Sequence, residues 1–314
     1  MAGETTTTTL NDLVNGYVIS PSMLSYAMEY IVATDKFRYY SLIGQNANVL
    51  QVARFALDYT VNDNGASLDN EFDGTEGTAL SLTALDTDQV QFTCSEFAVA
   101  RAITDNVYED SIMGASLISM VMQDAAHLLS MAVEAAGCAL FGSLSNVSGS
   151  SGSDATIAQA IACADGIRTR GTNAPDGVVF TLDNVQWSDL KTAAVATSTS
   201  VVTYGQSAEQ ILGLSRNPNQ YSAARMVGTI YGIPVYETGV TATANAGADV
   251  AGACWTPSSP GNDPHATFAY VDKRPFRMEI ERDALLRSDV AVFSRRCAVG
   301  EASDFSGGAL VTDA

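Results

Sequence analysis

Residues 106–141 read NVYEDSIMGASLISMVMQDAAHLLSMAVEAAGCALF, a run in which most side chains are small or apolar. Asn106 followed by Glu109 resembles a capping box, and Gly142 stands where a C-terminal cap is favoured. One helix over this span would be roughly 50 Å long. Its polar stripe is narrow, so we expect it to pack on the strands near the C-terminus, with Leu128 in the core. The stripe consists of residues spaced by three or four: Ser116, Ser119, Gln123, His127, Ser130 and Glu134.

An acidic β-hairpin is predicted before this helix. Apolar and polar residues alternate over residues 55–61 and again over 80–94, which favours two strands. The segment 62–77 between them is rich in acidic and turn-forming residues. Residues 51–94 hold eight acidic residues and one basic residue, a net charge of −7. An isolated two-stranded hairpin is only marginally stable in water, so this arm needs another surface to lie on.

The pattern after residue 141 predicts a second lobe and then long strands. Residues 142–153 are rich in Ser and Gly and predict a flexible linker. Residues 228–237 predict two strands joined by a tight turn, and the small, polar and proline residues of 239–264 predict a loop. The other expected elements are a helix over about 154–170, a strand over 178–180, a helix over about 184–196 and long strands within the last 50 residues.

The composition indicates a protein whose surface is largely covered. Acidic residues number 35 and basic residues 16, which gives a net charge of −19. Binding to nucleic-acid phosphates or to an anionic membrane requires a basic surface. We therefore expect neither sequence-specific nucleic-acid binding nor docking on such a membrane. Charged residues make up 16% of the chain, against about 25% in an average soluble protein. This deficit indicates that much of the surface is buried by the protein's own layers or by copies of itself.

The cysteines argue against a secreted protein built on disulfides. Their number is odd and no two of them form a CxxC pair. The sequence also opens without the basic and apolar regions of a secretory signal. We therefore expect folding in a reducing cytoplasm, with five inert core thiols: Cys94, Cys138, Cys163, Cys254 and Cys297.

A search for catalytic and metal-binding motifs yields no site. The sequence has neither a Walker loop nor a G-x-S-x-G elbow. Its two histidines, His127 and His265, are too few for a multi-histidine metal centre. The run DNEFDG at residues 69–74 resembles the start of a calcium loop, but Leu80 stands at position twelve, where a bidentate acid belongs. We therefore expect no catalytic residue, no cofactor and no bound metal.

Three passages carry a family resemblance when they are taken in order. The first is the Thr-rich opening that leads to LNDL at residues 10–13, and the second is GTIYGIPVYE at 228–237. The third is the tail, with YVDKRPF at 270–276, RRCAVG at 295–300 and ALVTDA at 309–314. Together, along nearly the whole chain, they resemble the tailed-bacteriophage major capsid proteins of the Hong Kong 97 fold.

The resemblance implies an α+β fold with an N-terminal arm, an extended hairpin called the E-loop, a peripheral domain with a long spine helix, and an axial domain. The corresponding boundaries are residues 1–50 for the arm, 51–94 for the E-loop, 95–152 for the first part of the peripheral domain, 153–265 for the axial domain and 266–314 for the second part of the peripheral domain.

In that family the E-loop lies across a neighbouring subunit, so the resemblance also implies which residues meet between subunits. The E-loop is acidic, whereas residues 272–296 hold seven basic and five acidic residues, a net charge of +2. Residues 51–94 contain no lysine, which leaves no donor for an isopeptide cross-link. The implied interface residues are Phe55, Leu57, Tyr59, Asp69, Glu71, Phe72 and Asp73 on the E-loop, and Lys273, Arg274, Arg277 and Arg282 on the peripheral domain.

The function implied by the resemblance is self-assembly into the hexamers and pentamers of an icosahedral phage head, which encloses double-stranded DNA without reading its sequence. The implied location is the virion, after assembly in the cytoplasm of a bacterial host. A separate cement or scaffolding protein and a portal are the further partners that it suggests. Two alternatives stay open: the shell of an encapsulin-type compartment, and a hydrolase with a dispersed Ser/His/Asp site.

Overall fold

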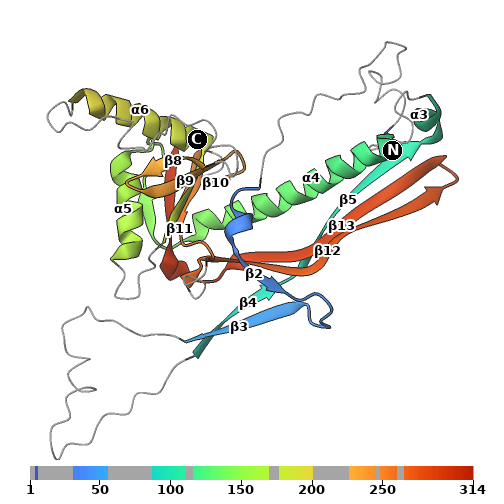
Figure 1. The fold of residues 1–314 in the computed structure, drawn as a ribbon, viewed down its shortest axis with the longest axis horizontal. Coiled ribbons are helices and arrows are strands. Elements are labelled where there is room, and N and C mark those ends of the chain that lie inside the picture. The colour runs from blue at the N-terminus through green and yellow to red at the C-terminus, as the bar shows by residue number, and fades with distance from the viewer. Residues whose placement is uncertain are drawn as a thin grey trace, which may run out of the picture.

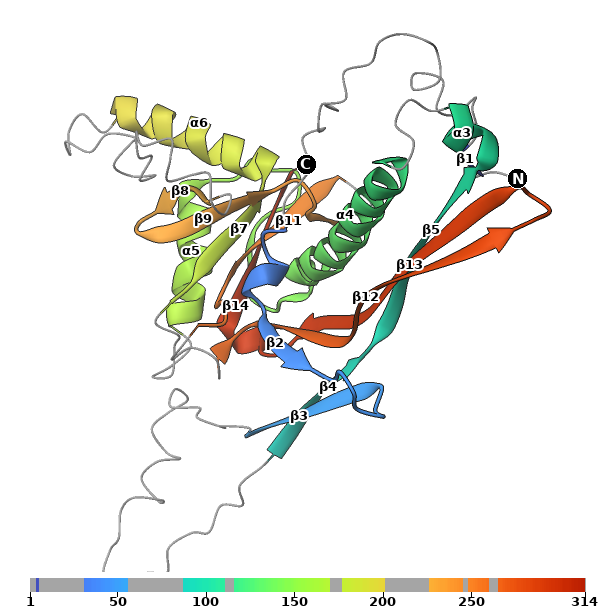
Figure 2. The ribbon, with the colours of Figure 1, turned by 45° about the vertical axis from the view of Figure 1, so that its right-hand side comes forward.

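The computed structural model describes residues 4–5, 31–55, 87–110, 116–169, 177–200, 226–244, 248–259 and 265–313. These residues form two sheets and a separate two-stranded hairpin (Figure 1). A long helix, α4, connects the two sheets along one side of the molecule (Figures 1 and 2). The fold therefore mixes helices and strands, as the sequence predicts.

The first sheet has the strand order β1-β5-β13-β12-β2. Strands β12 and β13 pair antiparallel from Phe268–Glu301 to Asp283–Ser288 and form a long ribbon, which confirms the strands predicted near the C-terminus. Strand β5 pairs antiparallel with β13, while β1 and β2 pair parallel with β5 and β12. The strand bounds are Glu4–Thr5 for β1, Arg38–Ser41 for β2, Ser95–Thr104 for β5, Phe268–Asp283 for β12 and Ser288–Glu301 for β13.

Helix α4, Ser116–Cys138, packs on this sheet as predicted, but the single helix over 106–141 is wrong. Asp105–Asp110 form a separate short helix, α3, and Ala139–Ser143 form a 3-10 helix, η2. Asp105 is held by the ion pair described below, which fixes the start of α3 at the end of β5.

The buried stripe of α4 follows a spacing of four residues and differs from the predicted one. Ala125 and Leu129 are buried against Ala291 and Phe293 of β13. Leu128 is 38% exposed, so its predicted place in the core is wrong. By length and composition alone, Met120–Ser143 could cross a membrane. In the structure, 39% of the apolar window of this helix is buried, and Ala125 and Leu129 pack on β13.

The second sheet has the order β6-β14-β11-β7-β9-β8, with β10 paired to β11. Helices α5, Ile157–Arg168, and α6, Asn184–Ser200, contribute Ile167, Trp187 and Leu190 to the same core. Thr156 caps α5 through a capping box with Gln159. The strand bounds are Val147–Gly149 for β6, Val179–Asp183 for β7, Met226–Ile230 for β8, Ile233–Thr238 for β9, Ala242–Ala244 for β10, Asp249–Trp255 for β11 and Gly307–Asp313 for β14.

This sheet confirms some predicted elements and corrects two others. The strand pair around the GTIYGIPVYE motif is present as β8 and β9, joined at Tyr231 and Gly232 with positive φ angles of 49° and 84°. The loop predicted over 239–264 is wrong, because β11 lies within it and every residue of β11 is buried. The flexible linker predicted over 142–153 is also wrong, because β6 pairs with β14.

An aromatic cluster joins the two sheets. Trp255 of β11 lies 5.5 Å from Phe268 of β12, measured between ring centroids, and Phe37 lies 5.3 Å from Trp255. Phe141 of η2 packs on Phe268 with its centroid at 5.6 Å. All four rings are buried, so the two sheets share one core at the point where α4 ends. The predicted domain boundaries remain predictions.

Candidate assembly surface

The base of the predicted hairpin is present. Strands β3, Val49–Phe55, and β4, Thr87–Thr93, pair antiparallel, and Phe55 is opposite Thr87 at the last described pair. Phe92 is buried and stacks on Tyr40 of β2 at 6.4 Å, which fixes the hairpin to the first sheet. In Figures 1 and 2 both strands run away from the two sheets. The other predicted contact residues lie outside the described residues: Leu57, Tyr59, Asp69, Glu71, Phe72 and Asp73.

The predicted basic contact residues lie on β12, and each already has a partner in its own subunit. Arg274 pairs with Glu96 at 2.5 Å, and Arg277 pairs with Glu279 at 2.5 Å. Lys273 donates from Nζ to the carbonyl of Gln45. The side chains of both ion pairs are at least 32% exposed, so each pair contributes little to stability. These residues stay available for a neighbour, and their role between subunits stays a prediction.

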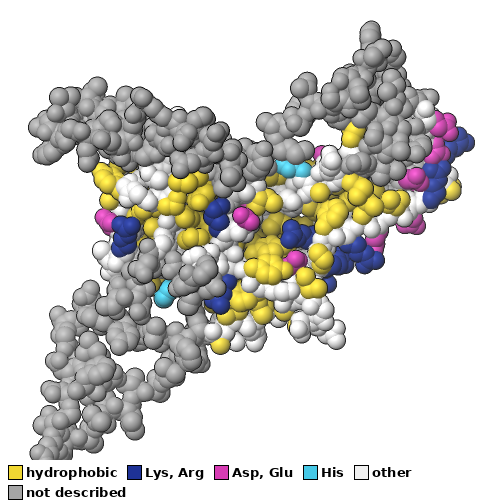
Figure 3. All heavy atoms as spheres, viewed as in Figure 1, with side chains coloured by type: hydrophobic (Ala, Val, Ile, Leu, Met, Phe, Trp, Pro, Cys, Tyr) yellow, Lys and Arg dark blue, Asp and Glu magenta, His cyan; other side chains and the backbone are white. Residues whose placement is uncertain are grey.

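Arg282 holds the tip of the ribbon to α3. Its guanidinium donates to both carboxylate oxygens of Asp105, at 2.5 and 2.6 Å, and to Asp289 at 3.2 Å. These hydrogen bonds hold the pKa of the Asp105 carboxyl below its ordinary value. Figure 3 shows basic and acidic side chains mixed at this end of the molecule. The tip of the ribbon therefore carries charges of both signs rather than a uniformly basic face.

The ribbon also exposes apolar side chains close to these charges. Phe276 is 42% exposed, Ile280 52% and Leu285, in the turn, 95%. Ile280 borders an apolar cavity of about 330 Å³ that also touches Val121 of α4 and Phe293 of β13. Exposed apolar side chains beside charged ones are typical of surfaces that bind another protein. Only the charged residues of this ribbon were predicted as contact residues from the sequence, although the alternation of apolar residues along 276–280 is visible there.

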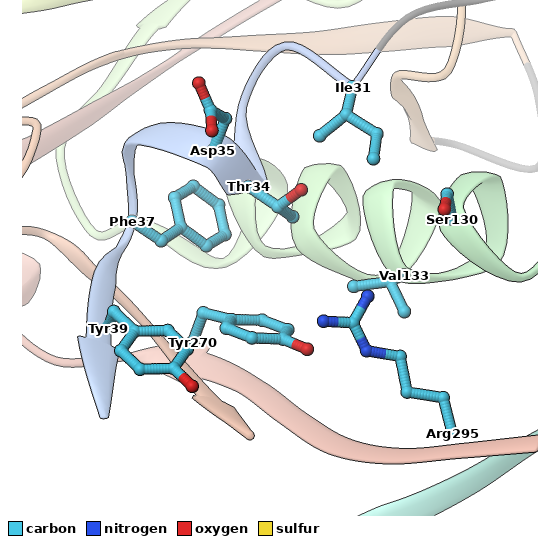
Figure 4. A pocket seen from close by; sticks show the side chains of 9 residues that line it. All are labelled: Ile31, Thr34, Asp35, Phe37, Tyr39, Ser130, Val133, Tyr270 and Arg295. Carbon is cyan, nitrogen blue, oxygen red and sulfur yellow. The ribbon is translucent and has the colours of Figure 1, made fainter. Parts of the chain in front are cut away.

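One basic residue of the same region differs from those selected by sequence. Arg295 on β13 has Asp272 as its nearest acid, at 3.8 Å, which is too long for a hydrogen bond. Its side chain is 27% exposed and borders a cavity beside α4 (Figure 4). The sequence could not distinguish Arg295 from the other arginines of this region, because their partners within the subunit are known only from the fold.

Glu134 of α4 anchors the segment that enters the first sheet. Its carboxylate is fully buried and accepts hydrogen bonds from the backbone N–H groups of Val32, Ala33 and Thr34, at 2.9, 2.6 and 3.0 Å. The hydroxyl of Thr34 donates a fourth, at 2.6 Å. Gly137 allows this close approach, because a Cβ atom there would lie 2.6 Å from the Thr34 methyl carbon. The sequence predicts Glu134 at one end of the polar stripe of this helix. In the structure, residues 32–34 cover that end of the stripe.

The described residues hold no group of three or more His, Cys, Asp or Glu side chains arranged to bind a metal ion. The DNEFDG run lies outside them, so its resemblance to a calcium loop stays a prediction. All five cysteines are buried and free. Burial raises the pKa of the thiols of Cys94, Cys138, Cys254 and Cys297, which supports their interpretation as inert core residues.

Among known proteins, this architecture has counterparts in solved structures. No protein-family model and no curated protein sequence matches the chain. Solved structures match it over nearly its whole length. The capsid structure of Helicobacter pylori bacteriophage KHP30 is similar with a TM-score of 0.67 and 10% sequence identity, covering 97% of this chain and 97% of that chain. A structure from Mycobacterium phage Che8 gives 0.63 and 16%, covering 94% and 96%.

The chain has the fold of phage capsid proteins. This is the Hong Kong 97-like fold that the sequence predicts, with the hairpin, the long helix and the second lobe in the expected order. An encapsulin complex from Synechococcus elongatus is similar with a TM-score of 0.61 and 8% identity, covering 98% of this chain and 94% of that chain. Phage capsids and an encapsulin complex therefore share the architecture described above.

Proposed function

We propose that this chain is the major capsid protein of a tailed phage and assembles with copies of itself into the icosahedral shell that encloses the phage DNA. The observation that carries this proposal is the match to phage capsid structures over 94–97% of the chain. The charge supports it, because a protein with a net charge of −19 does not adhere to the DNA packed inside. The role is structural and non-enzymatic, and its place is the virion.

The proposed domain organisation follows the boundaries predicted from the sequence. Residues 1–50 form the N-terminal arm and 51–94 the E-loop, residues 95–152 with 266–314 the peripheral domain, and 153–265 the axial domain. Strands β5, β12 and β13 in one sheet and β7, β8 and β9 in the other agree with this division, whereas β6 and β14, from the segments assigned to the peripheral domain, lie in the second sheet. Hexamers and pentamers then form in the bacterial cytoplasm, with a portal and a cement or scaffolding protein as further partners.

Electron microscopy of the purified chain tests the proposal. We expect closed shells of uniform diameter at high protein concentration, together with slowly sedimenting subunits at low concentration. A chain that stays monomeric at every concentration, with or without a co-expressed scaffolding protein, contradicts it. The similarity to an encapsulin supports a second candidate, a protein-cargo compartment. Shells recovered from the native host with a protein cargo and without DNA would favour that candidate.

The charged ribbon leads to a prediction about assembly. The triple variant Arg274→Glu, Arg277→Glu and Arg282→Glu is expected to fold and to assemble poorly, because the acidic hairpin of a neighbour would meet like charges. Assembly of the unmodified chain should also slow as salt screens the attraction. Light scattering measures the assembly rate, and circular dichroism shows whether the subunit is folded.

The control for this variant is a second triple reversal, at Arg101, Arg168 and Lys191, which changes the net charge equally on other elements. If charge complementarity at the ribbon matters, only the first variant assembles poorly. Equal assembly of the two variants at every salt concentration would show that the ribbon charges do not select the neighbour.

A further inference from the structure

Two cysteines meet in the core of the second sheet. Cys163 lies on α5 and Cys254 on β11, and both side chains are fully buried in the same apolar cluster. They are far apart in the sequence, which holds no CxxC pair, so only the fold brings them together.

Gly308 of β14 leaves room for the Cys163 sulfur beside Cys254. Gly308 is the residue opposite Cys254 in the antiparallel pairing of β14 with β11. A Cβ atom at Gly308 would lie 2.9 Å from the Cys163 sulfur, so this sulfur occupies the space that a side chain at position 308 would fill. Opposite residues of an antiparallel pair carry their Cβ atoms on the same face of the sheet, about 4.5–5.5 Å apart. The Cys163 sulfur therefore lies next to the Cys254 side chain.

The two thiols also interact directly. The Cys254 thiol donates a hydrogen bond to the Cys163 sulfur, and the Cys254 backbone N–H faces the same atom. The hydrogen bond from the Cys254 thiol holds the pKa of the Cys163 thiol below its ordinary value, whereas burial raises the pKa of the Cys254 thiol. Cys163 is therefore the more acidic thiol of the pair. This property sets it apart from the remaining cysteines, whose pKa values burial raises: Cys94, Cys138 and Cys297.

Both sulfur atoms are carried by regular elements that are held on each side. Asn146 donates a hydrogen bond from Nδ2 to the Cys163 carbonyl at 3.4 Å, which holds this turn of α5 near β14. Cys254 lies on an inner strand, because it pairs with Phe180 of β7 on one side and with Gly308 of β14 on the other. The approach of the two thiols is therefore built into the fold and does not depend on a loop.

Adjacent thiols of which one is acidic are the arrangement that oxidation converts into a disulfide. Both thiols are buried, so an oxidant must be nearly as small as water to reach them, and hydrogen peroxide meets this requirement. We propose that Cys163 and Cys254 form a site of oxidative modification, at which a peroxide closes a disulfide between α5 and β11. This inference concerns the single subunit and goes beyond the proposed function, on which it does not depend.

The reaction takes place in two steps. In the first, the Cys163 thiolate attacks one oxygen of the peroxide, an S–O bond forms and the O–O bond breaks, which leaves a sulfenic acid on Cys163 and releases hydroxide. The proton lost by Cys163 converts this hydroxide into water. In the second, the Cys254 sulfur attacks the Cys163 sulfur, the S–S bond forms, and the hydroxyl leaves with the Cys254 proton as a second water molecule. The two thiols are oxidised by two electrons together, and the peroxide is reduced by two.

The disulfide would stabilise the lobe that contains the second sheet. It closes the chain from residue 163 to residue 254 into a loop, which includes α6 and the strands β7, β8, β9 and β10. A cross-link across so long a loop restricts the unfolded chain, so the melting temperature of the oxidised subunit is expected to be about 5–10 °C higher than that of the reduced subunit. A small dithiol should reverse the change, because thiol–disulfide exchange restores both thiols.

Treatment of the purified full chain with hydrogen peroxide tests the proposal. Mass spectrometry should find the chain lighter by two hydrogen atoms, and peptide mapping should find Cys163 and Cys254 in one cross-linked pair of peptides. Cys163→Ala and Cys254→Ala should neither form this bond nor gain thermal stability from peroxide. Cys138→Ala is the matched control, because it removes another buried thiol from a helix and should respond to peroxide as the unmodified chain does.

Several results would overturn the proposal. They are cysteines that stay reduced in peroxide, oxidation of Cys163 that stops at an acid, a disulfide between Cys94 and Cys297 in place of the expected one, and a bond between Cys163 and Cys254 that leaves the melting temperature unchanged. If Cys163→Ala does not fold, peptide mapping of the unmodified chain still decides, because it needs no variant. Failure of the chain to form shells counts against the proposed function alone and leaves this inference standing.

Discussion

Leu129→Asp is expected to abolish folding of the subunit, whereas Leu128→Asp leaves a folded subunit. Leu129 is 2% exposed and packs against Phe293, so an aspartate there would bury an unpaired charge in an apolar cluster. Such a burial costs several kcal/mol, a large part of the roughly 5–15 kcal/mol by which a domain is stable. Leu128 is 38% exposed, so the same charge at that position remains in contact with water.

Soluble yield, circular dichroism and size-exclusion chromatography of the two variants check this prediction. The variants differ by one position in the same helix and carry the same new residue, so helix propensity and net charge are matched. If Leu128→Asp were the unfolded variant, the buried face of α4 would have to be the one inferred from the sequence. If both fold with unchanged stability, α4 does not pack on the ribbon.

This pair of residues also shows how far the sequence could predict the fold. The length and apolar character of residues 116–138 predict a covered helix, and α4 is one. When most positions are small or apolar, however, the pattern does not determine which face is buried. That choice depends on where β13 places Ala291 and Phe293, a contact between residues more than 150 positions apart.

The missed strands have a different physical cause. Strand β11 reads DVAGACW and is buried throughout, so it lacks the polar and apolar alternation by which a strand is recognised. Strand β6 lies in a Ser- and Gly-rich segment and gains its structure by pairing with β14. Both strands are stabilised mainly by neighbours distant in the chain, and such partners are invisible to local pattern.

For the candidate site, the sequence predicted two segments of opposite charge, but it did not show which of the charged side chains have partners within the subunit. Opposite charges on the hairpin and on residues 272–296 are a property of composition, so they could be found without a structure. Arg274 and Arg282 have partners within the subunit and Arg295 has none at hydrogen-bond distance, a distinction that only tertiary contacts make.

Glu134→Gln is expected to destabilise the subunit by about 3 kcal/mol, because hydrogen bonds to a charged group contribute more than neutral ones and an unsatisfied buried donor adds its own cost. The carboxylate accepts four hydrogen bonds from residues 32–34 and is fully buried. Glutamine keeps only one oxygen, and its amide N–H groups would face donors that need an acceptor. Asp124→Asn, at an exposed ion pair on the same helix, is the control and should change stability by at most about 1 kcal/mol.

Urea unfolding measures the free energies of both variants, and hydrogen exchange shows where Glu134→Gln acts. Residues 31–41 should lose protection first, because Glu134 holds the start of this segment on α4. Protection that falls equally everywhere would mean that the segment and the core unfold together. A loss of stability no larger than that of Asp124→Asn would show that the four hydrogen bonds do not hold the segment.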